Sequence, residues 1–239
     1  MAMKHSFITS IVSNRYHVYH EGAIVEAIAR GRLRLKDKPR VGDWVYLEED
    51  DDGNVLIDRI LPRKNVLTRP FVANVDQALI VTSMREPNFS YQLLDRLLFL
   101  VSYENIKPVV IISKTDLVSK EEVREVVSEY EDVYPVYTTG LNDDAFDIES
   151  ILKDKISVLA GQSGVGKSSI LNRINPDFSL RTQAISKALG RGRHTTRHNE
   201  LFQLGEGWIA DTPGFSSLDF KHLDPFTFAQ SVEDFKPYL

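Results

Sequence analysis

Gly161-Gln162-Ser163-Gly164-Val165-Gly166-Lys167-Ser168 gives the strongest indication of the fold of this chain. It fits the pattern G-x-x-x-x-G-K-[ST], and it lies between the apolar run Ile156–Ala160, a predicted strand, and a predicted helix from Ser168–Asn172 onward. The glycines allow backbone N–H groups to turn toward phosphates, and Lys167 can reach the β- and γ-phosphates of a nucleotide. The alternative is a chance glycine-rich loop, which the flanking strand and helix disfavour.

Two further motifs lie on either side of this loop, in an unusual order. Ser113-Lys114-Thr115-Asp116 closes the apolar run Pro108–Ile112, and its carboxylate can accept from guanine N1–H and N2, donors that adenine lacks. Asp211-Thr212-Pro213-Gly214 follows Trp208-Ile209-Ala210, about 44 residues after Lys167. Either motif alone is typical of an ordinary turn. With the phosphate loop, they predict a GTP site whose motifs follow one another in circularly permuted order. The motif that recognises guanine, the base reader, comes before the phosphate loop.

The predicted site combines nucleotide contacts with a metal shell. The Ser168 hydroxyl and Asp211 would ligate Mg²⁺, and a switch threonine, Thr196 with Thr195 as the alternative, would join them. The Gly214 N–H would sense the γ-phosphate. The predicted GTP-binding residues are Ser113, Lys114, Thr115, Asp116, Thr138, Thr139, Gly161, Gln162, Ser163, Gly164, Val165, Gly166, Lys167, Ser168, Ser169 and Gly214.

Short β-rich stretches separated by turn signals occupy the chain up to about Thr68. Five strands in about 65 residues predict a small closed barrel, and the OB-fold is the commonest five-stranded form, with an SH3-like barrel as the alternative. We expect an RNA-binding barrel at residues 1–68. The predicted strands are Ser6–Val12, Tyr16–Tyr19, Ala23–Ala29, Val41–Leu47 and Val55–Ile60.

From Phe71 onward, strands and helices alternate, which predicts a mostly parallel, doubly wound α/β sheet at residues 69–220. Ser90 and Ser119 are predicted to begin helices, the second through the capping box Ser119-Lys120-Glu121-Glu122. Asp224-Pro225 predicts the start of a C-terminal helical region at residues 221–239. The other predicted elements are the strands Ala78–Thr82, Pro108–Ser113, Val133–Tyr137 and Ile156–Ala160, and a short helix at Phe146–Leu152.

Composition excludes several classes of protein. The chain has 239 residues, 42% of them apolar, and a net charge of −5, which argues against a uniformly basic nucleic-acid coat protein. It contains no cysteine, and this removes disulfides, thiol catalysis and thiolate metal sites. No apolar run approaches the roughly 18 residues of a membrane span. We therefore expect a monomer in the cytoplasm, with no membrane partner.

Two basic segments are candidates for RNA contact. Arg30–Arg40 alternates Arg and Leu, which would place its charges on one face of a strand, as phosphate contacts require. Gly190–Thr196 lies where a switch loop is expected. A solvated charge run is the alternative for either segment. The candidate RNA-contacting residues are Arg30, Arg32, Arg34, Lys36, Arg191 and Arg193.

The permuted order, together with Gly192-Arg193-His194-Thr195-Thr196, resembles the ribosome small subunit-dependent GTPase A family of circularly permuted bacterial GTPases. The resemblance covers nearly the whole chain. It implies an OB-fold that binds ribosomal RNA, slow GTP hydrolysis stimulated by the 30S subunit and its 16S rRNA, and a role in late 30S assembly. It also implies a C-terminal zinc domain with Cys and His ligands. Because the chain lacks cysteine and ends at Leu239, we expect that domain to be missing, by truncation or by natural loss.

Two residues depart from common GTPase patterns. Phe215 stands where Ras-like enzymes carry the water-orienting Gln, so the resemblance and proximity in sequence indicate His194 as the catalytic residue beside Lys167. His194 could instead contact RNA. Ser113 stands where most GTPases carry Asn, and its shorter side chain predicts a weaker bridge between base and phosphate loop.

Three functions fit this sequence. The first is a GTP hydrolase that acts in small-subunit assembly. The second is a guanine-nucleotide-dependent RNA-binding module whose hydrolysis is incidental. The third is an ATPase or kinase with the same phosphate loop, which Asp116 argues against.

Overall fold

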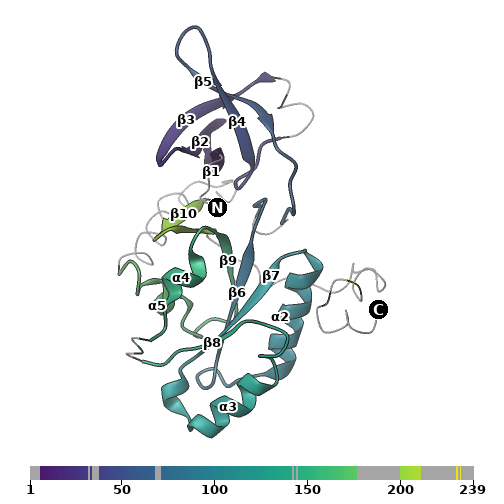
Figure 1. Cartoon of the computed structure of the whole chain (residues 1–239), viewed down its shortest axis with the longest axis vertical. Helices are drawn as coiled ribbons and strands as arrows, with labels where there is room; N and C mark the ends of the chain where they lie inside the picture. The colour runs from purple at the N-terminus through teal and green to yellow at the C-terminus, as the bar shows by residue number, and fades with distance from the viewer. Residues whose placement is uncertain are drawn as a thin grey trace, which may run out of the picture.

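A closed barrel of five strands forms the first part of the computed structural model, which describes residues 6–31, 33, 38–67, 71–141, 143, 145–176, 200–210, 230 and 232 (Figure 1). The strand order is β1-β2-β3-β5-β4, with β4 paired back onto β1. This is the five-stranded barrel that the sequence predicts, in the OB-like order. Its strands are β1 (Ser6–Val12), β2 (Arg15–His20), β3 (Ala23–Ala29), β4 (Trp44–Glu49) and β5 (Val55–Ile60).

One predicted barrel strand begins later than expected. The sequence predicted a strand from Val41, but β4 starts at Trp44. The Asp43 carboxylate accepts the Arg40 N–H at 2.7 Å and is fully buried against Arg63 Nε at 2.6 Å. These bonds hold residues 40–43 in a turn, because a backbone N–H given to a side chain is not available to the sheet.

A six-stranded sheet forms the second part, in the order β10-β11-β9-β6-β7-β8. All neighbours pair in parallel except the hairpin of β10 and β11. The mostly parallel sheet is confirmed, whereas β10 was not predicted. The strands are β6 (Gln77–Ser83), β7 (Lys107–Ser113), β8 (Val136–Thr138), β9 (Ile156–Ala160), β10 (Leu201–Leu204) and β11 (Gly207–Ala210).

Strand β8 is shorter than the predicted Val133–Tyr137. The N–H groups of Val133 and Tyr134 both donate to the Tyr130 carbonyl, at 3.1 and 2.9 Å, so these residues continue a helical turn. Pro135 follows and has no N–H to give to a ladder. The strand therefore starts only at Val136.

Helices cover both faces of the sheet (Figure 1). The helices are α2 (Tyr91–Tyr103), α3 (Lys120–Ser128), α4 (Ile148–Leu152) and α5 (Lys167–Leu171), with a short 3-10 turn, η1, at Thr115–Leu117. In β6, Ala78 and Ile80 pack in the cluster that contains α2 and α3, while Leu79 and Val81 pack in the cluster that contains α4 and α5. Alternate residues of a strand face opposite sides, so a strand buried on both sides reads as one continuous apolar run.

The first two helices begin where the sequence predicts. The Ser90 hydroxyl accepts from the Leu93 N–H at 3.3 Å. Ser119 and Glu122 form a complete capping box at the start of α3. Such caps satisfy N–H groups that a helix leaves without partners at its first turn.

One apolar cluster contains residues of both the barrel and the sheet. In β1, Ile8 packs inside the barrel, but its neighbour Phe7 packs in the cluster of the sheet. The Phe7 ring lies 5.1 Å from that of Trp208 in β11. An isolated bridge joins Ser10 of β1 to Glu200, directly before β10. The barrel therefore rests on the hairpin β10–β11.

Most of the C-terminal part of the chain lies outside the described residues. The helix predicted at Asp224-Pro225 lies outside the described residues. Among the helices that the structure describes, none has both the length and the apolar character needed to cross a membrane.

Candidate nucleotide-binding site

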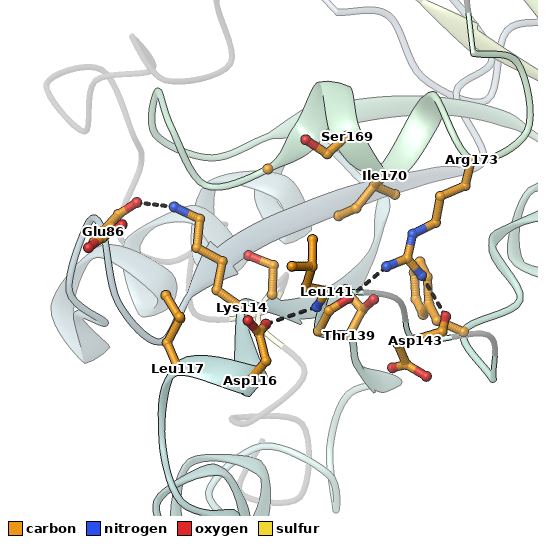
Figure 2. Close-up of a pocket in the computed structure, with 14 residues that line it drawn as sticks. Glu86, Lys114, Asp116, Leu117, Thr139, Leu141, Asp143, Ser169, Ile170 and Arg173 are labelled. Carbon is orange, nitrogen blue, oxygen red and sulfur yellow. Dashed lines mark hydrogen bonds between the residues drawn. The ribbon is translucent and has the colours of Figure 1, made fainter.

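A pocket of about 740 Å³ opens at the carboxyl ends of β7 and β8, beside the loop that follows β9 (Figure 2). Ligands of open α/β sheets bind outside the carboxyl ends of the strands, near the point where the strand order reverses, which here lies between β6 and β9. The pocket is lined by Glu86, Ser113, Lys114, Asp116, Leu117, Thr139, Gly140, Leu141, Asp143, Phe146, Gly166, Ser169, Ile170 and Arg173.

The phosphate loop occupies residues 161–166 between β9 and α5, and all three of its glycines have a positive φ. Gly161 has φ +128°, and a Cβ there would lie 2.1 Å from the Val81 carbonyl oxygen of β6. Gly166 has φ +94° and directly precedes α5. Residues with side chains rarely adopt such angles. The spacing of the motif is therefore required by the backbone path.

Lys167 points back into the phosphate loop. Its Nζ donates to the carbonyls of Gly161 at 2.9 Å and Gln162 at 2.5 Å. Burial lowers the pKa of the Lys167 ammonium, because removal from water disfavours the charged form. A bound phosphate chain would offset this effect by supplying negative charge.

Ser113 bridges the base side and the phosphate side of the site. Its hydroxyl lies 2.6 Å from the carbonyl oxygen of Val165 in the phosphate loop and 3.0 Å from that of Thr82 in β6. The short side chain therefore reaches the phosphate loop, and the weaker bridge to the base stays a prediction. The loop folds onto the end of β7, so that the short side chain suffices.

Asp116 and Lys114 flank the pocket after β7. The Asp116 carboxylate accepts the Leu141 N–H on Oδ1 at 2.9 Å, which fixes its orientation (Figure 2). Lys114 has a left-handed backbone, with φ 56°, and its Nζ donates to the Glu86 carbonyl. Together they form a polar edge with one oriented carboxylate, which is what recognition of adjacent N–H donors on a base requires.

Thr139 is a buried residue of the pocket with spare hydrogen-bonding capacity. Its side chain is 3% exposed, and within the described residues its Oγ1 has no hydrogen-bond partner. A buried hydroxyl without a partner is unfavourable unless a ligand or water satisfies it. Thr138, the last residue of β8, is exposed and lies outside the pocket lining.

The structure brings six of the predicted GTP-binding residues into the pocket lining: Ser113, Lys114, Asp116, Thr139, Gly166 and Ser169. The far wall of the pocket was not predicted from the sequence and consists of Gly140, Leu141, Phe146 and Arg173. These residues follow β8 or end α5 and carry no motif. The only available signal was their position after a strand of a parallel sheet, where ligand-binding loops gather.

Several predicted site residues lie outside the described residues. They are Arg32, Arg34, Lys36, Arg191, Arg193, His194, Thr195, Thr196, Asp211 and Gly214.

The basic barrel segment differs from its prediction. Gly31 and Leu33 are helical, and the Leu33 N–H donates to the Arg30 carbonyl at 2.9 Å, so the predicted strand is wrong. Arginine and leucine have good helix propensity, and the alternation alone does not select a strand. The Arg30 guanidinium pairs with Glu48 at 2.5 Å and with Asp58 at 3.2 Å. Its charge is therefore already partly neutralised within the barrel.

Fold and site together define a circularly permuted P-loop GTP-binding protein. Comparison with known sequences is specific: residues 60–221 match the family model "RsgA GTPase", and residues 7–57 match "RsgA N-terminal domain". The chain belongs to the RsgA GTPase family.

Named relatives and solved structures agree with this assignment. The small ribosomal subunit biogenesis GTPase RsgA of Shouchella clausii is 46% identical over 93% of this chain and 78% of its own length. The protein of the same name from Bacillus cereus is 48% identical over 89% and 75%. The crystal structure of YjeQ from Thermotoga maritima has a TM-score of 0.79 at 34% identity, covering 97% of this chain and 82% of that one. YloQ, described as a circularly permuted GTPase, has a TM-score of 0.78 at 35% identity, covering 97% and 78%.

Proposed function

We propose that this chain hydrolyses GTP to GDP and phosphate as a step in the late assembly of the small ribosomal subunit. The single observation that carries the proposal is the oriented carboxylate of Asp116, held across one pocket from a phosphate loop that Ser113 ties to the same strand end. The relatives named as small ribosomal subunit biogenesis GTPases support the cellular role. The 30S particle and its 16S rRNA are the proposed partners of a cytoplasmic monomer that does not act on membranes.

Within the site, each residue has a proposed task. Asp116 accepts from guanine N1–H and N2, with Lys114, Thr115, Thr138 and Thr139 completing the base side. Residues 161–166 enclose the phosphates, Ser169 lines the pocket beside them, and Lys167 neutralises phosphate charge as it develops in the transition state. The Gly214 N–H senses the γ-phosphate.

Mg²⁺ is the proposed cofactor. The Ser168 hydroxyl is exposed directly after Lys167, and a neutral hydroxyl oxygen is a hard donor of the type that Mg²⁺ prefers. Asp211 and Thr196, with Thr195 as the alternative, are the proposed further ligands. Across the described part of the chain, no group of three His, Cys, Asp or Glu could hold a metal. In this proposal the phosphates of the nucleotide supply further oxygen ligands. When bound, the ion neutralises charge on the phosphate oxygens.

The decisive experiment is a GTPase assay of the purified chain with and without 30S subunits. We expect stimulation by 30S subunits, none by 50S subunits, and no comparable hydrolysis of ATP. Hydrolysis that 30S subunits leave unchanged would favour the second candidate, an RNA-binding module with incidental hydrolysis. Efficient ATP hydrolysis would contradict the proposed selectivity for guanine.

His194 is the proposed water-orienting residue. We expect His194→Ala to bind GTP normally but to lose subunit-stimulated hydrolysis by roughly 10²–10⁴-fold, the range of a lost acid–base or positioning group. His198→Ala, four residues further along the chain, is the matched control and should keep the stimulated rate. A His194→Ala variant at the wild-type rate would transfer this role to a ribosomal group.

RNA contact is proposed for the barrel and for the segment that contains Arg191 and Arg193. Changing Arg32 and Arg34 to Glu should weaken binding to 30S subunits and reduce its salt dependence, because phosphate contacts release counterions. Arg30 and Lys36 contribute to the same surface in this proposal, Arg30 only in part because it is paired internally. Unchanged binding at every salt concentration would place the RNA site elsewhere.

We propose domain limits of 1–68 for the barrel, 69–220 for the GTPase domain and 221–239 for a helical C-terminal region.

A further inference from the structure

Arg173 joins the two halves of the nucleotide pocket. It follows α5, the helix that begins at Lys167 in the phosphate loop, and its side chain crosses to the segment after β8 (Figure 2). The guanidinium donates to the Gly140 carbonyl at 2.7 Å and to the Asp143 carbonyl at 2.9 Å. Its carbon lies 5.5 Å from the centre of the Phe146 ring. The planar, many-donor guanidinium suits this task, because one group can hold two carbonyls at once.

The contact to Gly140 matters because of the peptide group to which that carbonyl belongs. The Gly140 carbonyl and the Leu141 N–H are parts of one planar peptide, and in the usual trans form they point in opposite directions. Arg173 holds the oxygen of this peptide, while its N–H donates to Asp116 Oδ1 at 2.9 Å. The orientation of this peptide plane is therefore fixed by one hydrogen bond at its oxygen and one at its nitrogen.

The same arrangement also acts through charge. A cation at the carbonyl oxygen polarises the peptide and strengthens the hydrogen bond that its N–H donates, since linked hydrogen bonds polarise one another. Asp116 Oδ1 still has a second lone pair after accepting from Leu141. The carboxylate thus stays free to accept from a base, with its plane fixed.

We propose that Arg173 is a positioning residue for guanine recognition, which aligns Asp116 through the Gly140–Leu141 peptide. This inference rests on the proposed role of Asp116 as the guanine reader. Arg173 does not touch the base in this proposal. Since α5 starts in the phosphate loop, Arg173 also ties the alignment of the base reader to the element that holds the phosphates.

The test compares GDP with IDP, whose base lacks the N2 amino group. Asp116 can make two hydrogen bonds to guanine but only one to hypoxanthine, so the ratio of the two affinities reports how well the carboxylate is aligned. Calorimetric titration of the full chain with each nucleotide gives this ratio. The variants are Arg173→Ala, Arg173→Lys and Asp116→Ala. The matched control is Arg124→Ala. Arg124 lies on α3, away from the pocket, and pairs with Glu131.

We expect Arg173→Ala to weaken GDP binding by about tenfold and IDP binding by about threefold, as hydrogen bonds from a charged donor are among the stronger ones. The GDP-to-IDP ratio then falls about threefold. Arg173→Lys should restore part of the ratio, because an ammonium can donate to one of the two carbonyls. Arg124→Ala should leave both affinities within about twofold of wild type, since exposed ion pairs contribute little.

Two outcomes would overturn the inference. One is a wild-type ratio in Arg173→Ala when Asp116→Ala abolishes the ratio, because Asp116 then reads guanine without help from Arg173. The other is an equal loss of GDP and IDP affinity, which would indicate a general disturbance of the segment. If Asp116 does not recognise guanine at all, the result differs, because Asp116→Ala would then itself keep the wild-type ratio of GDP to IDP affinity. Thermal unfolding of each nucleotide-free variant checks that the fold is intact, and Arg173→Lys carries the test if the alanine variant does not fold.

Discussion

The nucleotide pocket and the barrel use their polar side chains in different ways. In the pocket, Ser113, Asp116 and Arg173 bond to backbone groups of other segments, so each fixes a loop relative to a strand end. On the barrel surface, several charged side chains pair with one another, as Arg15 does with Glu26 and Arg30 with Glu48. Bonds from a side chain to a buried backbone group constrain geometry, whereas exposed ion pairs constrain it little.

This difference explains why one region can be interpreted from its motifs and the other cannot. The pocket needs certain residue types at fixed spacing, because its backbone path excludes the alternatives at Gly161 and Gly166. The barrel strands are indicated by alternating apolar residues, a pattern that does not specify the charges on the barrel surface. A basic run in such a surface therefore does not by itself identify a nucleic-acid site.

The largest effect is expected where the barrel meets the sheet that carries the pocket. Phe7→Ala should lower the free energy of unfolding by about 3–5 kcal/mol, because a fully buried ring leaves a cavity between barrel and sheet. Denaturant unfolding measures this loss. The matched control is Phe71→Ala, whose ring is 47% exposed and should cost about 1 kcal/mol at most. A loss below about 1 kcal/mol for Phe7→Ala would mean that the barrel and the sheet do not share a core.

The next effect is on turnover. Lys167→Ala should reduce the GTP hydrolysis rate by about 10²–10³-fold or more, because developing phosphate charge then lacks its preorganised cation. Ser168→Ala should also abolish turnover by removing a proposed Mg²⁺ ligand. Lys153→Ala serves as control, since Lys153 pairs with Glu206 outside the pocket. Wild-type rates in either site variant would contradict the phosphate-loop assignment.

A smaller effect is expected on affinity. Asp116→Asn should weaken GTP binding at least tenfold, about 1.4 kcal/mol, because an amide cannot accept from both guanine donors. Fluorescent-nucleotide titration measures the change. Asp132→Asn replaces an exposed acid and should bind GTP as the wild type does. Equal GTP affinity of the two variants would contradict the assignment of Asp116 as the residue that recognises guanine.

The smallest effect is expected in the barrel. Arg30→Ala should change the free energy of unfolding by no more than about 1 kcal/mol, because its ion pairs with Glu48 and Asp58 are partly exposed. Nucleotide affinity should not change. A loss above about 2 kcal/mol would show that the barrel's ion pairs constrain its structure as the pocket's bonds do, and would end the contrast between the two regions.

Sequence patterns were sufficient for the elements whose residues have one structural solution. The capping box at Ser119, the buried run of β6 and the phosphate loop were all predicted, because local bonding or strand periodicity decides them. The permuted order of the site is likewise a property of the sequence alone. The closed five-stranded barrel was predicted from strand periodicity, and its strand order, β1-β2-β3-β5-β4, came from the structure.

Tertiary structure decided the features that depend on distance between remote segments. The reach of Ser113 to Val165 follows from how closely the phosphate loop approaches β7, which residue type cannot indicate. Arg173 has no motif, and its role arises only where the end of α5 meets the segment after β8. The sequence determined which chemical groups the site contains, because the motifs require particular side chains and glycines. The fold decided which of these groups meet, because hydrogen bonds act only over a few ångströms.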